Sequence, residues 1–164
     1  MDAISWAPIP GFEGTYEVST QGHVRRTAPV RGSKVGRVLR PQVKKGYPFV
    51  YLFLEGRRYG RLVHRLVALA FLGDPGAGFE VCHKDGDSMN PRLENLRWDT
   101  RSANVLDTVQ HGTNFWASKT HCPAGHEYDS ANTYVDRNGA RNCRACRRVS
   151  SARYTAKIRG AKVA

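Results

Sequence analysis

The residues best suited to chemistry lie in the middle of the chain. His83 is followed by Asn95 twelve positions later, and by Asn104 nine positions after that. Imidazole titrates near neutral pH, so a histidine can accept a proton where a carboxylate is too weak a base. An amide can fix one imidazole tautomer, and an amide oxygen is a ligand that a hard divalent cation accepts. This trio suits metal-assisted hydrolysis of a negatively charged substrate.

A second group, near the C-terminal end, has the spacing of metal ligands and comprises Cys122, His126, Cys143 and Cys146. Two thiolates separated by two residues can bind one ion from a tight turn, and Gly125 supplies backbone freedom just before the histidine. Three thiolates and one imidazole complete a tetrahedral zinc site and leave no open position, which predicts a structural Zn²⁺. His121 is an alternative ligand, but the glycine favours its neighbour at position 126.

Short strands and two helices are expected to position these groups. Alternating and β-branched runs predict strands over residues 16–19, 23–26, 47–54, 59–63, 79–83 and 96–98. Helical periodicity predicts a helix over 64–72, ended by Gly73, and a second helix that starts at Thr100 or Ser102 and runs to Gln110. Leu66, Val67, Phe71, Leu96 and Trp98 are expected core residues. The predicted class is α+β, with a strand-rich N-terminal module.

The charge of the chain indicates a polyanionic partner. Lys and Arg number 26 against 14 acidic residues, which gives a net charge of +12. Residues 1–60 hold ten basic and four acidic side chains and residues 113–164 hold ten and three, whereas residues 61–112 hold six and seven. The basic flanks are predicted to bind phosphates. The candidate residues are Arg25, Arg26, Arg37, Arg40, Lys44, Lys45, Arg57, Arg58, Arg144, Arg147 and Arg148.

The composition and the first residues of the sequence disfavour a membrane protein and a secreted protein. No apolar run approaches the roughly 18 residues of a membrane span, and the first ten residues lack the pattern of a secretory signal. We therefore expect an intracellular, cytoplasmic protein that does not bind membranes. Four cysteines in such a compartment favour metal binding over disulfides.

The middle segment resembles the HNH nucleases, particularly the homing endonucleases of phages. The resemblance is carried by VHRLVALAF, VCHKDGDSMNPRLENLRW and RSANVLDTVQHG within residues 63–112. The upstream stretch WAPIPGFEGTYEVSTQGHVRR resembles the NUMOD4-like DNA-binding module that is often fused to such nucleases. The cysteine-rich end is similar to the zinc-ribbon-like elements appended to phage HNH proteins.

The resemblance implies a ββα-metal finger that hydrolyses double-stranded DNA and leaves 5′-phosphate and 3′-hydroxyl ends. By this match His83 is the general base, Asn95 holds its ring in orientation, and Asn104 ligates Mg²⁺ or Mn²⁺ from the helix. The implied organisation is a NUMOD4-like module at 1–60, the HNH finger at 61–112, a zinc-binding element at 113–148 and a basic tail at 149–164. The tail is expected to be disordered when alone, and the protein to act as a monomer or homodimer.

Cys82 departs from the family pattern, because the residue before the base commonly supplies the second metal ligand. Three interpretations are open. The thiol packs as a small apolar group on the strand face opposite His83; it ligates a transition metal, since sulfur is a soft ligand; or the metal uses Asp85, Asp87 or Asp99 instead. His64 and His111 lie at predicted helix edges, where structural hydrogen bonding is favoured over phosphate contact.

Two rival functions follow from the same residues. A degenerate finger would give a non-catalytic DNA-binding protein, and Cys82 is the main argument for it. A zinc-knuckle protein that binds RNA is the second rival, because single-stranded RNA and duplex DNA both attract basic surfaces.

Overall fold

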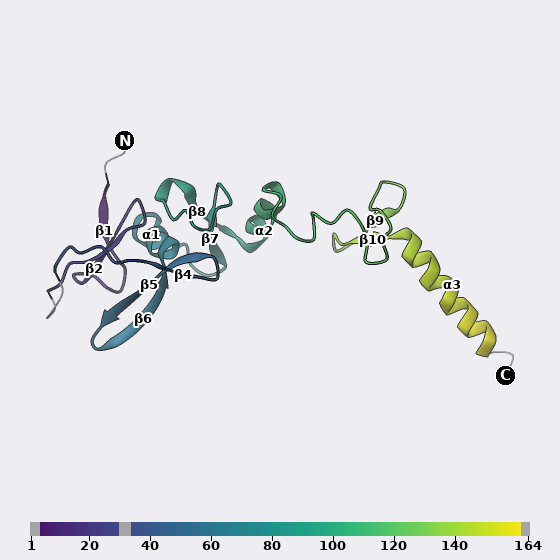
Figure 1. The fold of residues 1–164 in the computed structure, drawn as a ribbon, viewed down its shortest axis with the longest axis horizontal. Helices are drawn as coiled ribbons and strands as arrows, with labels where there is room; N and C mark the ends of the chain where they lie inside the picture. The colour runs from purple at the N-terminus through teal and green to yellow at the C-terminus, as the bar shows by residue number, and fades with distance from the viewer. Residues whose placement is uncertain (1–3, 30–33, 162–164) are drawn as a thin grey trace. The chain divides into compact units, whose positions relative to one another are not determined.

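A computed structural model describes residues 4–29 and 34–161, which form two compact units, Met1–His111 and Gly112–Ala164. Figure 1 shows the chain as a ribbon, with its helices and strands labelled in chain order. The division falls one residue before the predicted boundary at 112. The predicted boundary between residues 60 and 61 falls inside the first unit, because both sides of it share one core.

Two small antiparallel sheets form the N-terminal part of the first unit. β1 (Trp6–Pro8), β2 (Tyr16–Ser19) and β3 (Val24–Arg26) pair in that order, and so do β4 (Gln42–Lys44), β5 (Tyr47–Leu54) and β6 (Arg57–Leu62). The β5–β6 hairpin turns through Glu55 and Gly56, which both have positive φ, at 49° and 73°. Two positive φ angles are what a two-residue hairpin needs to match the twist of its strands.

Helix α1 (Val63–Leu72) follows β6 without a loop and provides the centre of the core. Its buried face packs with residues from both sheets and from the strands that follow, in one hydrophobic cluster. Leu66, Val67 and Leu96 are buried in this cluster, while Phe71 and Trp98 pack against it partly exposed. The module and the finger are therefore held together by a continuous apolar core.

The finger consists of β7 (Phe79–His83), β8 (Leu96–Thr100) and α2 (Arg101–Gln110), with a short 3₁₀ turn, η1 (Leu93–Asn95), before β8. The strands are antiparallel, and His83 pairs with Leu96 at the end of the ribbon that adjoins the connecting loop. Thr100 caps α2, since its hydroxyl accepts a hydrogen bond of 3.3 Å from the Ala103 backbone N–H. Strand, loop, strand and helix follow in the predicted order.

The second unit has a two-stranded sheet, β9 (Thr133–Val135) and β10 (Arg141–Cys143), and a long helix, α3 (Arg144–Ala161). In Figure 1 the yellow α3 extends away from the β9–β10 sheet. The expectation of a disordered tail is not met up to residue 161, because the tail continues α3; residues 162–164 lie outside the described residues. Alanine and arginine are strong helix formers, which accounts for the helix. The structure confirms the α+β class.

None of the helices in the described ranges is both long and apolar enough to cross a membrane.

Candidate functional site

His83 lies at the end of β7 with its ring turned towards the core of the first unit. Ring centroids of His83 and His64 are 5.0 Å apart, and that of Tyr47 is 6.0 Å from His83. Burial lowers the pKa of His83 below its ordinary value, although the carboxylates of Asp85 and Asp87 act in the opposite direction. The ring is therefore neutral at pH 7 and able to accept a proton.

His64 is the second imidazole of this cluster, and it is only 4% exposed. Its Nδ1 and the Nε2 of His83 are buried without a hydrogen-bond partner among the described residues. Burial, with smaller contributions from His83 and Arg65, lowers the pKa of His64 to about 4. The structural hydrogen bond expected for His64 is thus not found at Nδ1, and its ring packs instead against Tyr47 and His83.

Asn95 organises the loop that follows His83. Its side-chain oxygen accepts a hydrogen bond from the Asp85 backbone N–H at 3.0 Å, and its amide nitrogen donates to the Asp85 carboxylate and to the Asn90 carbonyl, both at 2.9 Å. Both amide hydrogens are occupied, so this side chain has no donor left for the His83 ring. The geometry differs from the expected role: Asn95 holds the loop and Asp85, not the imidazole itself.

Asn104 extends from α2 towards the opposite side of β7. Its amide nitrogen donates a hydrogen bond of 2.9 Å to the Glu80 carboxylate. Side chains alternate between the two faces of a strand, so Glu80 and Cys82 share the face covered by α2, whereas Val81 and His83 face α1. His83 and Asn104 therefore lie on opposite faces of β7.

Cys82 is fully buried, and burial is the main reason why the pKa of its thiol is raised. A raised pKa keeps the thiol protonated at neutral pH, when metal binding requires the thiolate. Across the strand pair, Arg97 binds the carboxylates of Asp99 and Asp107 at 3.2 and 2.5 Å. Of the three interpretations of Cys82, packing as a small apolar group fits these contacts best.

The donors on the α2 face of β7 suit a hard cation. The Glu80 carboxylate and the Asn104 amide provide oxygen atoms, which Mg²⁺ and Mn²⁺ prefer. Asp85 is engaged by hydrogen bonds from Asn90 and Asn95, which together with the Asp87 backbone outweigh its burial and lower its pKa. In the described ranges, three or more His, Cys, Asp or Glu ligand atoms come together only in the second unit.

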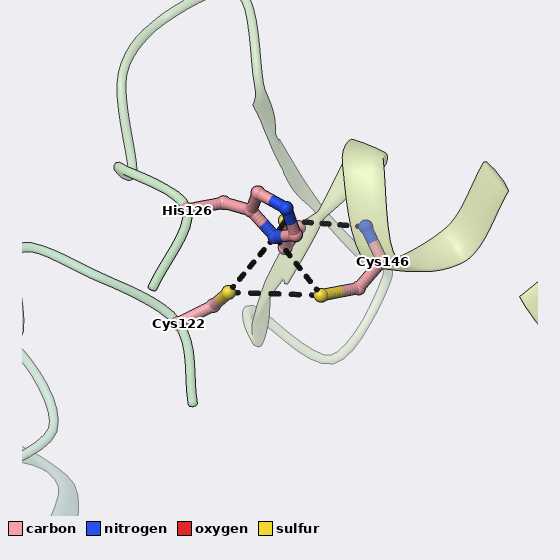
Figure 2. Close-up of side chains that lie close together, drawn as sticks. Cys122, His126 and Cys146 are labelled. Atoms are coloured by element: carbon pink, nitrogen blue, oxygen red, sulfur yellow. Dashed lines mark hydrogen bonds between the residues drawn. The ribbon is translucent and has the colours of Figure 1, made fainter. Parts of the chain in front are cut away.

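That cluster comprises Cys122, His126, Cys143 and Cys146, whose ligand atoms all lie within 4.8 Å of one another. Figure 2 shows His126 between the Cys122 and Cys146 sulfurs. The two sulfurs are 3.6 Å apart, and His126 Nδ1 lies 3.5 Å from Cys122 and 3.4 Å from Cys146. A tetrahedron with metal–sulfur bonds of about 2.3 Å has edges of about 3.8 Å, so the four side chains fit Zn²⁺.

The surroundings of the cluster favour a thiolate. Hydrogen bonds from the Cys146 backbone N–H and from Asn132 hold the pKa of Cys143 at about 6. Gly125 has a φ of 79°, and its N–H donates to the Cys122 carbonyl, which closes the turn before His126. The ring of His121 is instead within 2.9 Å of the Thr120 hydroxyl. The geometry favours His126 as the ligand.

Comparison with known proteins supplies the remaining observation. Residues 61–106 match the model of the HNH endonuclease family, and residues 5–53 match the NUMOD4 motif. The chain is 39% identical over 111 residues to the DNA endonuclease I-HmuI of Bacillus phage SP01. These aligned residues cover 67% of this chain and 60% of I-HmuI. The chain thus contains an HNH endonuclease segment and a NUMOD4 motif, and it is homologous to I-HmuI. 

Further relatives of this HNH protein include the H-N-H endonuclease F-TflII of Escherichia phage T5, 35% identical over 81 residues, which cover 48% of this chain and 41% of that protein. A solved structure of I-HmuI, described as DNA binding and cleavage by this HNH homing endonuclease, matches with a TM-score of 0.58 and 38% identity. It covers 67% of this chain and 60% of the other. The chain thus spans about three fifths of the length of I-HmuI.

The basic residues predicted to bind phosphates differ in their exposure and in their contacts within the protein. Arg25 pairs with Glu17 at 2.7 Å and lies over Trp6, and Arg26 binds the Tyr16 hydroxyl, so both support the fold. The other six candidates in the first unit are exposed: Arg37, Arg40, Lys44, Lys45, Arg57 and Arg58. The three in α3, Arg144, Arg147 and Arg148, are exposed as well.

Sequence reasoning missed Glu80 and Tyr47, whereas the structural hydrogen bonding favoured for His111 is found. Glu80 lies two residues before Cys82, so the strand period already put it on the same face. His111 Nε2 is 3.1 Å from the Lys84 carbonyl, which ties the end of α2 to the loop after His83. Tyr47 gave no signal in the sequence, because its contact with His83 depends on how β5 packs against β7.

Proposed function

We propose that this protein is a metal-dependent DNA endonuclease that hydrolyses phosphodiester bonds in double-stranded DNA. The single observation that carries the proposal is the match of residues 61–106 to the HNH endonuclease family, since this segment contains His83, Asn95 and Asn104. The net charge of +12 supports a polyanionic substrate. I-HmuI, a relative, is described as binding and cleaving DNA.

His83 is proposed as the general base. Its neutral ring takes a proton from a water molecule, whose oxygen attacks the phosphorus atom. The bond from phosphorus to the 3′ oxygen then breaks and that oxygen takes up a proton, leaving 5′-phosphate and 3′-hydroxyl ends. Asn95 fixes the loop after the base through Asp85, which keeps the strand end in place.

Asn104 and Glu80 are proposed to hold the divalent cation through their side-chain oxygens. A cation at this position supplies positive charge that stabilises the phosphate in the transition state. Because these residues and His83 lie on opposite faces of β7, one phosphate can meet both only at the end of β7 where His83 lies. The DNA backbone would then cross the loop end of the ribbon, beside the loop that Asn95 holds.

The same arrangement gives weight to a second candidate function, a DNA-binding protein with an inactive finger. The separation of His83 from Asn104 and the burial of Cys82 are the observations that favour it. The test is nicking of supercoiled plasmid with Mg²⁺ or Mn²⁺, with wild type beside His83→Ala and the exposed-histidine control His23→Ala. Cutting that depends on His83 but not on His23 supports the nuclease. Binding without any His83-dependent cutting supports the inactive finger.

The cluster of three cysteines and His126 is proposed to bind one structural Zn²⁺. The second unit contributes no residue to the hydrophobic core cluster of the described chain, so a bound ion would provide the stability that apolar packing does not. Mass spectrometry of the intact protein and metal analysis of the purified chain test this proposal directly.

A further inference from the structure

The second unit presents a cluster of arginines organised by one tyrosine. Tyr134 on β9 accepts a hydrogen bond of 2.7 Å from Arg147 Nη1. The guanidinium groups of Arg147 and Arg144 lie 5.1 and 5.7 Å from the centre of its ring. A tyrosine ring that contacts two cations in this way limits the conformations of their side chains, which prepares them to bind a ligand.

No carboxylate among the described residues pairs with these arginines. The ion pairs in the described parts of the chain all belong to the first unit, where Arg97, for example, is held by two carboxylates. Two of the three acids of the second unit serve local turns instead: Asp129 accepts from the Asn132 N–H, and Asp136 from three nitrogen atoms of residues 138, 140 and 142. The positive charge of α3 is therefore available to a ligand from outside.

A hollow of about 630 Å³ lies beside this cluster, lined by Tyr134, Arg144, Arg147, Arg148 and Ser151. Guanidinium groups and a hydroxyl converge there, which is the chemistry that binds phosphate oxygens. Beyond the hollow, Thr155 and Arg159 follow Arg144, Arg148 and Ser151 at intervals of three or four residues along α3. This spacing places them on one side of the helix, over about 22 Å.

The position of this surface depends on the cysteine cluster. Cys143 ends β10 and Cys146 lies in the first turn of α3. Asn132 connects the same parts, because its carbonyl accepts from the Arg144 N–H at 2.7 Å and its side chain accepts from the Ala145 N–H at 3.0 Å. An ion held by the cluster would fix α3 against the β9–β10 sheet, and hence the arginines against Tyr134.

We infer that the hollow beside Tyr134 and the adjoining side of α3 form a second DNA-binding surface, which takes the phosphate backbone of a duplex. The inference rests on the proposed function in that its partner is the proposed substrate. The matched family models end at residue 106, so this surface belongs to a part of the chain outside them. It binds the backbone through charge and guanidinium geometry and does not depend on base sequence.

The experiment measures the affinity of the full chain for a labelled 30-base-pair duplex by fluorescence anisotropy, over a series of salt concentrations without added Mg²⁺ or Mn²⁺. The test variant is Arg144→Ala with Arg148→Ala. The matched control is Arg153→Ala with Lys157→Ala, which removes the same charge from the other side of α3. The test variant is expected to bind about tenfold more weakly and to lower the slope of log K against log salt by about 2. The control is expected to stay within about threefold of wild type.

A second variant distinguishes loss of the binding surface from misfolding of the second unit. Tyr134→Phe removes only the hydroxyl that accepts from Arg147, and it is expected to weaken binding by about threefold with unchanged metal content. Equal weakening by the test and control variants, or no weakening by the test variant and Tyr134→Phe, would overturn the inference. Plasmid nicking is measured in parallel, so an inactive finger with normal DNA binding counts against the proposed nuclease and not against this surface.

Discussion

The amide nitrogen of Asn104 donates a hydrogen bond of 2.9 Å to the carboxylate of Glu80, so α2 contacts β7 two residues before Cys82. This contact determines which side chains face the proposed cation. The proposed metal ligand is therefore the carboxylate of Glu80 and not the sulfur of Cys82, the residue before the base. Both side chains lie on the same face of the strand. A soft ligand and a hard ligand select different metals, so the two assignments can be separated by experiment.

Glu80→Gln is predicted to weaken Mn²⁺ binding in the presence of duplex DNA by about tenfold or more, because a neutral amide replaces the carboxylate. Cys82→Ala is predicted to leave Mn²⁺ binding within about twofold, since the buried, protonated thiol is not expected to be a ligand. Electron paramagnetic resonance of free Mn²⁺ measures both. A large loss of Mn²⁺ affinity in Cys82→Ala, with no loss in Glu80→Gln, would show that the thiol is a metal ligand.

The local elements of the fold were predictable from the sequence, because their signals are local. The strands at 16–19, 47–54 and 79–83 have the bounds that their patterns predict, and Thr100, one of the two expected candidates, caps α2. The four residues of the cysteine cluster come together as their spacing suggests. The contact of Asn104 with Glu80, and of His83 with His64, depends on how distant elements pack. No local pattern specifies such packing.

The sequence also did not predict which side chains of the finger lie close to one another. The family resemblance implied that His83 and Asn104 act together as base and metal ligand, whereas strand alternation places them on opposite faces of β7 once α2 packs against Glu80. Asn95 was expected beside the imidazole, but the tight loop at Asp85 and Asn90 takes up its hydrogen-bonding groups. Helix α3 was missed because a basic, apolar-poor tail has no core-facing stripe to indicate a helix.

Stability is predicted to fall between pH 7 and pH 4 because of the buried His64. Its pKa is about 4 in the folded protein and near 6.5 when unfolded, so the unfolded chain binds more protons within this window. The contribution is complete above pH 6.5 and is lost as pH falls towards 4. By pH 5 the loss is about 2 kcal/mol. Urea unfolding at pH 7.5 and pH 5 measures it.

His64→Asn removes the titrating ring and should reduce this pH dependence, although it lowers stability at pH 7.5. His23→Asn provides the control, because it makes the same substitution at an exposed position outside the core. Both variants keep the cysteine cluster, so acid effects on that unit cancel in the comparison. The same pH dependence in wild type and His64→Asn would contradict the prediction.

Gly86→Ala is predicted to disturb the loop after His83. Gly86 has a φ of 75°, and a Cβ there would lie 2.7 Å from His111 Nδ1. Gly76→Ala is the matched control, because it has a φ of 84° but no atom within 4 Å of its Cβ. Both changes incur backbone strain of about 1–3 kcal/mol, and only Gly86→Ala adds a steric clash.

Gly86→Ala should therefore have the lower urea midpoint of the two variants, together with a lower rate of His83-dependent nicking. The clash would displace the His111 ring, which is 3.1 Å from the Lys84 carbonyl next to the proposed base. Equal midpoints for the two variants would show that the loop absorbs the added methyl group.

Loss of the metal ligands in the second unit is predicted to affect DNA binding as well as folding. Cys143→Ser with Cys146→Ser should reduce bound zinc from about one per chain to none, and residues 112–161 should then be cleaved faster by protease than residues 1–111. Cys82→Ala is the control and should keep its zinc, because Cys82 is buried in the first unit. Metal analysis and limited proteolysis decide the outcome, and equal zinc content in both variants would refute the assignment.

The zinc ligands and the arginines of α3 are then predicted to act as one unit. If the ion fixes α3 against β9, removing it should lower DNA affinity about as much as Arg144→Ala with Arg148→Ala does. Combining the two sets of changes should add little further loss, because the arginines no longer have a fixed position beside Tyr134. Two independent, additive losses in the anisotropy assay would instead mean that the arginines bind DNA without help from the metal.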